Sequence, residues 1–129
     1  MRALVVDDSR AMRRIVGNIL SHAGFEVLQA GDGQQALDVL ETQTELPELA
    51  CVDWNMPVMD GLTFVSEVRK RPEWRGITLM MVTTESEQDR IVRALAAGAH
   101  EYLTKPFEAD DMRQKLEFLG LLPDVPVEV

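Results

Sequence analysis

Four short segments contain the residues whose chemistry stands out: Asp7-Asp8, Asp53, Thr83-Thr84 and Lys105-Pro106. Each of them closes or directly follows a short apolar run. Carboxylates that crowd together repel one another, which raises their pKa values or requires a cation. Mg²⁺ prefers oxygen ligands and commonly takes one or two carboxylates, with water and phosphate in the remaining positions. A nearby ammonium would neutralise phosphate oxygens, so these residue types favour a site that accepts phosphate on a carboxylate.

The order of the elements predicts that these segments meet at one edge of a sheet. Short apolar runs predict strands at 3–6, 25–30, 48–53, 77–82 and 100–104. Apolar residues at helical spacing predict helices at 9–24, around 36–40, at 62–70, 91–97 and 112–119. Continuous apolar strands that alternate with helices form a parallel sheet covered on both faces. Such sheets bind ligands at the carboxyl ends of their strands, where the polar segments lie.

The same residues also have a simpler interpretation. The chain contains 22 Asp and Glu residues, and a pair such as Asp7-Asp8 fits the first turn of a helix, where negative charge is favourable. A single lysine such as Lys105 is commonly just solvated. The ordered set of acids, hydroxyls and lysine after four separate strands favours the site over this interpretation.

Composition limits the classes of function. A chain of 129 residues is the size of one domain, and its net charge of −9 argues against direct nucleic-acid binding. Cys51 is the only cysteine, so we expect a core residue without an intrachain disulfide, and a cytoplasmic protein. Without a run of about 18 apolar residues, no membrane span is expected. We predict one domain at 1–119, and a loose tail at 120–129 because that stretch has two prolines and no periodicity.

Taken together, the motifs LVVDDS, DWNMPVMDG, MVTTE and YLTKPF resemble those of response-regulator receiver domains over about residues 2–119. Within that family, the chain is most similar to the single-domain chemotaxis regulators of the CheY type. The resemblance implies a flavodoxin-like three-layer sandwich with strand order 2-1-3-4-5. It also implies a cis peptide bond between Lys105 and Pro106. The expected role is a two-component signalling switch, which is not an enzyme beyond assisting its own phosphotransfer and dephosphorylation.

The resemblance further implies roles at the predicted site. Asp53 is the expected phosphoacceptor, and Thr83 and Lys105 are expected to contact the phosphoryl group. The implied Mg²⁺ ligands are Asp7, Asp8 (directly), Asp53 and the main-chain carbonyl of Asn55. Loss of phosphate is expected to be tuned by Asn55 and Glu85.

The resemblance also implies which residues pass the signal from the phosphorylated site to a target protein. Thr83 and Tyr102 are the expected switch residues, with Tyr102 turning from an exposed to a buried rotamer after phosphorylation. The altered face is formed by the fourth helix, the fifth strand and the last helix. Its implied target-binding residues are Gln88, Ile91, Tyr102, Thr104 and Lys115.

The expected partners are a histidine kinase, as phosphodonor, and a downstream protein target, with a flagellar motor switch among the candidates. A monomer or weak dimer is expected. Arg10, Arg13 and Arg14 fit either a kinase-docking surface or a solvated helix face. The alternatives are a stand-alone receiver in another phosphorelay, or the receiver part of a longer regulator. A phosphatase of the haloacid dehalogenase type is disfavoured, because its second aspartate is replaced here by Asn55.

Overall fold

The computed structural model describes residues 1–122, in which strands and helices alternate along the chain. The strands are β1 (Arg2–Val6), β2 (Glu26–Ala30), β3 (Leu49–Val52), β4 (Thr78–Thr83) and β5 (Glu101–Thr104). The helices are α1 (Arg10–His22), α2 (Gly33–Thr42), α3 (Gly61–Lys70), α4 (Gln88–Ala97) and α5 (Ala109–Phe118), with a short 3₁₀ helix η1 (Pro72–Trp74). The predicted strands are confirmed, and their bounds differ by no more than one residue at either end. The 3₁₀ turn was not predicted.

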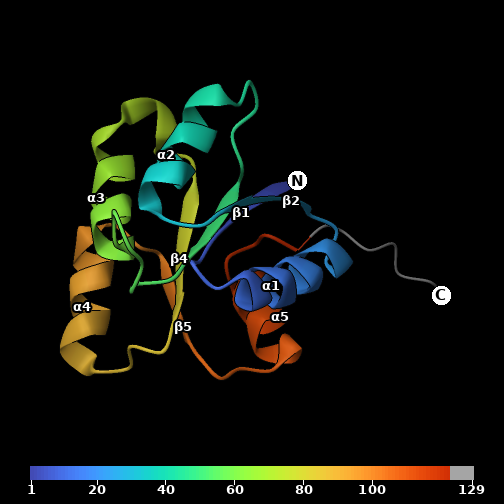
Figure 1. Ribbon diagram of the computed structural model, residues 1–129. Coiled ribbons are helices and arrows are strands. Elements are labelled where there is room, and N and C mark those ends of the chain that lie inside the picture. The colour runs from blue at the N-terminus through green and yellow to red at the C-terminus, as the bar shows by residue number, and fades with distance from the viewer. Residues whose placement is uncertain (123–129) are drawn as a thin grey trace.

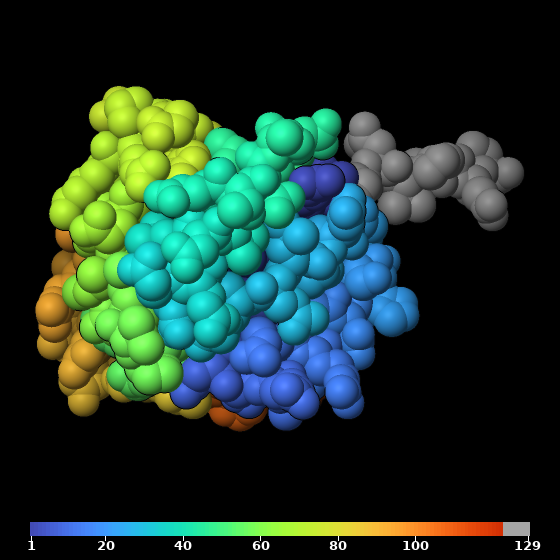
Figure 2. All heavy atoms as spheres, turned by 45° about the horizontal axis from the view of Figure 1, so that its top comes forward, coloured from blue at the N-terminus to red at the C-terminus, as the bar shows by residue number. Residues whose placement is uncertain are grey.

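All five strands are parallel and lie in the order β2-β1-β3-β4-β5, which confirms the predicted fold. Helices α2, α3 and α4 cover one face of the sheet, and α1 and α5 cover the other (Figure 1). In the space-filling view, α2 occupies the centre of the visible face, between α3 on one side and α1 on the other (Figure 2). All four residues of β3 are buried. Among residues 1–122, no helix combines the length and apolar character needed to cross a membrane.

Alternate residues of each central strand enter two separate cores. In β1, Leu4 and Val6 face α2 and α3, whereas Ala3 and Val5 face α1 and α5. Burial on both faces explains why the strands read as continuous apolar runs instead of alternating ones. Cys51 lies in the second core, where burial raises the pKa of its thiol to about 12. It is therefore a core residue, as predicted.

Side-chain caps fix where three helices begin, next to the carboxyl ends of the strands. The Ser9 hydroxyl accepts a hydrogen bond from the Met12 amide at the start of α1 (3.2 Å). The Asp32 and Asp60 carboxylates cap α2 and α3 in the same way, each with an oxygen 2.8 Å from an amide of the first turn. These caps satisfy amides that have no partner inside the helix. The loops that carry the polar residues are thereby anchored on both sides.

Ordered packing continues beyond the predicted domain boundary at residue 119. The amides of Gly120 and Leu121 donate to the carbonyls of Glu117 (3.0 Å) and Leu116 (2.8 Å), which is the Schellman arrangement at a helix end. Leu121 and its neighbour Leu122 pack against the second core. Most of the predicted tail, residues 123–129, lies outside the described residues, so the loose tail stays a prediction.

Candidate functional site

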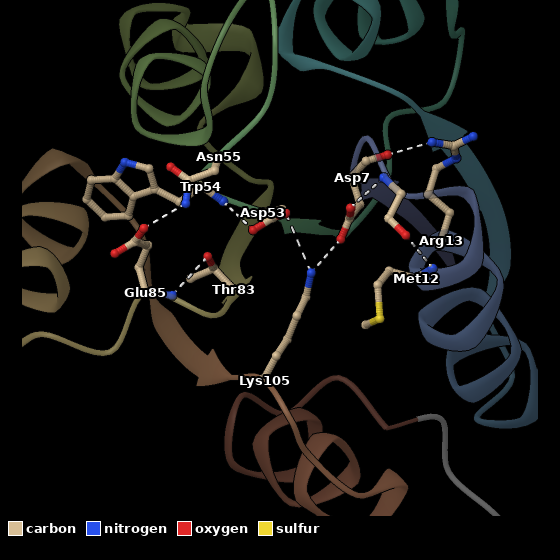
Figure 3. A network of polar contacts seen from close by, with 10 residues as sticks. Asp7, Met12, Arg13, Asp53, Trp54, Asn55, Thr83, Glu85 and Lys105 are labelled. Carbon is tan, nitrogen blue, oxygen red and sulfur yellow. Dashed lines mark hydrogen bonds and ion pairs between the residues drawn. The ribbon is translucent and has the colours of Figure 1, made fainter.

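Strand register brings the predicted residues to one rim of the sheet. The Asp53 amide donates to the Val6 carbonyl (2.9 Å), and the Lys105 amide donates to the Thr83 carbonyl (2.8 Å). Strands β1, β3, β4 and β5 therefore end side by side. Figure 3 shows the side chains of Asp7, Asp53, Thr83 and Lys105 gathered at this rim. The expectation that they meet is confirmed.

Three carboxylates form an acidic cluster at the centre of the rim. Asp7, Asp8 and Asp53 each place one carboxylate oxygen within 4.8 Å of the other two. Asp7 is buried, Asp8 is exposed, and the side chain of Asp53 is 12% exposed. An all-oxygen donor set of this charge suits a hard dication such as Mg²⁺. The residues present therefore fit the predicted metal.

Lys105 lies between two of these carboxylates. Its Nζ is 2.8 Å from Oδ2 of Asp7 and 3.5 Å from Oδ2 of Asp53, and its side chain is only 11% exposed. The Lys105–Pro106 peptide bond is cis, as predicted. The ammonium can therefore neutralise either carboxylate, or an oxyanion that arrives between them.

The electrostatic environment of Asp53 is mixed. Burial raises the pKa of its carboxyl above the ordinary value, and the charge of Asp7 adds to the rise. The Thr83 hydroxyl, the Lys105 ammonium and the Trp54 amide oppose it, because they favour the charged form. The Trp54 amide donates to Oδ1 of Asp53 (2.8 Å), while Oδ2 faces Lys105. The two oxygens thus have different partners.

Two glycines fix the loop that follows Asp53. A Cβ atom at Gly61 would lie 2.1 Å from the Asp53 carbonyl oxygen. Glycine is therefore required because the backbone at 61 approaches the Asp53 backbone closely. A Cβ at Gly33 would lie 2.7 Å from Cγ of Met59, whose carbonyl accepts from the Gly33 amide (3.1 Å). Neither close approach was predicted from the sequence, although Gly33 closes a conspicuous Gly-Asp-Gly run at 31–33.

Glu85 connects the loop that follows Asp53 to β5. Its amide donates to the hydroxyl of the buried Thr83 (3.3 Å), and its Oε1 accepts from the Asn55 side chain (2.6 Å). The Tyr102 hydroxyl donates to the Glu85 carbonyl (2.5 Å). Tyr102 is only 8% exposed, so the structure holds the buried rotamer and not the exposed one expected before phosphorylation. The four predicted tuning and switch residues thus form one connected network.

The predicted target-binding residues lie on three neighbouring elements. Gln88 and Ile91 are on α4, Tyr102 and Thr104 are on β5, and Lys115 is on α5. Gln88 is exposed, and Ile91, Thr104 and Lys115 are half-buried. The Lys115 ammonium pairs with Oε1 of Glu101 (3.1 Å). Target binding by this face stays a prediction.

Arginine contacts at the rim were not predicted. Nη1 of Arg13 donates to the carbonyl of Asp7 (2.6 Å). The guanidinium carbons of Arg90 and Arg93 lie 5.3 and 6.0 Å from the ring centroid of Trp54, within range of a cation–π interaction. In the sequence these residues look like ordinary charges on a solvated helix face. Only the tertiary arrangement reveals their partners.

The family described as "Response regulator receiver domain" matches residues 3–117 of the chain. The chain belongs to the response regulator receiver family. It is 42% identical over 118 residues to the chemotaxis protein CheY1 of Helicobacter pylori, covering 91% of this chain and 94% of that protein. Its structure is similar to the chemotaxis response regulator CheY4 of Vibrio cholerae, with a TM-score of 0.84 and 34% identity over 92% of this chain and 97% of CheY4. A third similar structure is a probable two-component response regulator/GGDEF domain protein, of which this chain covers 50% at 28% identity and a TM-score of 0.85.

Membership of the receiver family confirms the predicted resemblance. Receiver domains are regulatory modules of two-component signalling, which supports a switch and not an enzyme. They use Mg²⁺ at an acidic pocket, and the receiver domain described here has a cluster of three carboxylates.

Proposed function

We propose that this receiver domain accepts a phosphoryl group on Asp53 from a histidine kinase, in the presence of Mg²⁺. The observation that carries the proposal is the convergence of three carboxylates on one rim with Lys105 between two of them. Phosphoryl transfer asks a protein mainly for positioning and charge neutralisation, which this arrangement supplies.

In the proposed reaction, a carboxylate oxygen of Asp53 attacks the phosphorus atom of a phosphohistidine. The phosphorus–nitrogen bond breaks as the phosphorus–oxygen bond forms, and the electron pair returns to the imidazole. Asp7, Asp8, Asp53 and the Asn55 carbonyl would hold Mg²⁺, which when bound would neutralise the charge of the phosphoryl group. Lys105 moves its ammonium toward the transferred group, and the Trp54 amide keeps Oδ1 of Asp53 in place.

We propose that the signal then passes through the Glu85 network. A phosphoryl oxygen competes for the Thr83 hydroxyl, which now accepts from the Glu85 amide. Movement of Thr83 releases the segment that also holds the Tyr102 hydroxyl and the Asn55 side chain. Phosphate shifts this equilibrium only by the difference in its contacts between the two states. The output is a changed α4–β5–α5 face that controls a protein target.

A hollow next to Lys105 supports docking of the phosphodonor. It has a volume of about 500 Å³ and is lined by Met12, Ile15, Thr84, Lys105, Pro106 and Phe107. Ile15 is 50% exposed although it is a large apolar side chain. Exposed apolar surface beside a reacting group suits a partner that presents its phosphohistidine there.

Chemotaxis is the pathway that we propose, because the similar proteins named above include CheY1 and CheY4. Asn55 and Glu85 are joined by a hydrogen bond. We propose that these two residues tune the loss of phosphate, so that the signal is short-lived. A stand-alone receiver in another phosphorelay is the second candidate. The receiver part of a longer regulator is the third, favoured by the match to half of a response regulator/GGDEF domain protein.

The acceptor is tested with acetyl phosphate and intact-mass measurement. We expect one phosphoryl adduct on the wild type with MgCl₂, and none on Asp53→Asn or in excess EDTA. The substitution removes the carboxylate that is phosphorylated, and EDTA removes the Mg²⁺. Asp38→Asn is the matched control, since Asp38 is an exposed acid on α2. A full adduct on Asp53→Asn, or labelling that EDTA leaves unchanged, would contradict the proposal.

A further inference from the structure

Every polar atom of Asp7 has a partner. Its amide donates to the Ala30 carbonyl (3.1 Å), its Oδ1 accepts from the Ser9 amide (2.9 Å), and its Oδ2 accepts from Lys105 (2.8 Å). The carbonyl oxygen accepts from Nη1 of Arg13, at 2.6 Å. Three of these partners lie at strand ends or in the adjacent turn. Arg13 comes from within α1 and is the only one of them that contributes a side-chain charge to the backbone of Asp7.

Arg13 is itself held in place. Its Nε donates to Oε1 of Gln29 on β2 (3.3 Å), so the guanidinium bridges α1, β2 and the end of β1. Figure 3 shows the Arg13 side chain directed at the Asp7 main chain. A hydrogen bond from a charged donor is stronger than a neutral one, and the planar guanidinium sets its direction. The neighbouring Arg14 is exposed and makes no hydrogen bond or ion pair among residues 1–122.

We propose that Arg13 is a positioning residue of the magnesium site. By fixing the carbonyl of Asp7, it fixes the peptide that leads into Asp8, whose exposed carboxylate makes no hydrogen bond or ion pair of its own among residues 1–122. The inference rests on the proposed function, because it concerns the Mg²⁺ that Asp8 would bind. Groups that orient metal ligands commonly contribute about 10- to 100-fold to metal affinity.

Charge and position act on Mg²⁺ affinity in opposite directions, which makes the inference testable. A cation near the site repels Mg²⁺, so loss of charge alone would tighten binding. Loss of positioning would weaken it, because the Asp8 carboxylate would sample more directions. Arg14→Gln removes the same charge from the same helix without touching Asp7, and it therefore measures the charge effect alone.

The experiment is calorimetric titration of the purified protein with MgCl₂. We expect Arg13→Gln to bind Mg²⁺ about tenfold more weakly than wild type, and Arg14→Gln to bind at least as tightly as wild type. Arg13→Lys keeps the charge but loses the planar fork, so its affinity should also fall. Equal affinities of Arg13→Gln and Arg14→Gln would overturn the inference, as would wild-type affinity in Arg13→Lys.

Two further measurements separate this inference from its premises. Near-UV circular dichroism in EDTA checks that each variant is folded, and Arg13→Lys carries the test if Arg13→Gln is not. Asp8→Asn should lose Mg²⁺ binding altogether. If the wild type itself binds no Mg²⁺, the proposed site and this inference both fall. If the wild type binds Mg²⁺ and Asp8→Asn does not, the magnesium site stands. Wild-type Mg²⁺ affinity in Arg13→Gln and Arg13→Lys would then overturn only the positioning role of Arg13.

Discussion

At the scale of single residues, Asp53 is placed where its charge is costly until a cation arrives. Burial raises the pKa of its carboxyl, and the neighbouring Asp7 adds to the rise. The Lys105 Nζ lies 2.8 Å from Oδ2 of Asp7 and 3.5 Å from Oδ2 of Asp53, so one ammonium must neutralise two carboxylates. Under the proposed function, Mg²⁺ would offset the cost of the Asp53 charge, and phosphorylation would replace that carboxylate charge with phosphoryl oxygens that Lys105 could pair with. The environment that makes the Asp53 charge costly is thus consistent with the proposed role of Asp53 as phosphoacceptor.

We therefore expect Asp53→Asn to stabilise the protein in EDTA at neutral pH. A carboxyl whose pKa is raised in the folded state contributes stability below its unfolded pKa, and that stability is lost as pH rises through the folded pKa. The variant has no such loss, so its advantage should grow from about pH 4 upward. Urea unfolding in EDTA from pH 4 to pH 7 measures this. A variant less stable than wild type at pH 7 would contradict the assigned cause.

At the scale of elements, two helices fix the loop at 54–60, which follows Asp53. Helix α2 contacts it where the Gly33 amide donates to the Met59 carbonyl, and α3 begins at Gly61, against the Asp53 carbonyl. The loop also contains Val58, whose φ of 67° is unusual for a β-branched residue, and its side chain is 83% exposed. A loop that takes up such a conformation needs fixed ends, which the two close approaches provide.

Gly33→Ala should disturb both stability and phosphorylation. The new Cβ would lie 2.7–2.9 Å from Cγ, Cβ and the carbonyl oxygen of Met59, so the loop must shift. We expect a loss of about 1–3 kcal/mol in unfolding free energy, and slower labelling by acetyl phosphate. Gly76→Ala is the matched control, because nothing lies within 4 Å of its Cβ position. Similar behaviour of the two variants would mean that the α2 contact does not fix the loop.

At the scale of the whole molecule, sheet and rim were predictable because both follow from local patterns. Continuous apolar runs identify buried strands, and the polar residues after them share a rim because parallel strands end on the same side. Contacts across the sequence were not predictable in this way. The arginines that reach Asp7 and Trp54 occupy positions typical of a solvated helix face, and the Gly33 contact joins residues 26 positions apart. Periodicity describes which face of an element is buried, and does not specify which polar side chain meets which backbone atom.

A second set of polar contacts lies away from the rim that carries the carboxylate cluster, and it joins three elements. Nδ1 of His100 accepts from the Leu79 amide (3.1 Å) and lies 3.1 Å from Nη2 of Arg69. Arg69 also donates to the carbonyls of Gly98 and Ile77, each at 3.0 Å. Helix α3, β4 and the turn into β5 are thus tied together through one imidazole. Since Nδ1 acts as an acceptor, the imidazole must be neutral there.

This arrangement predicts a dependence of global stability on pH. Burial lowers the pKa of His100, and the Arg69 charge lowers it further. The unfolded state then binds the proton more readily, so stability is present above the unfolded pKa, about 6.5, and is lost as pH falls through the folded pKa. Urea unfolding between pH 5 and 7.5 should show this loss in the wild type and a smaller one in His100→Gln, whose amide oxygen can still accept from Leu79. His22→Gln is the control because it removes the other histidine. An undiminished loss in His100→Gln would show that the imidazole is not the group responsible.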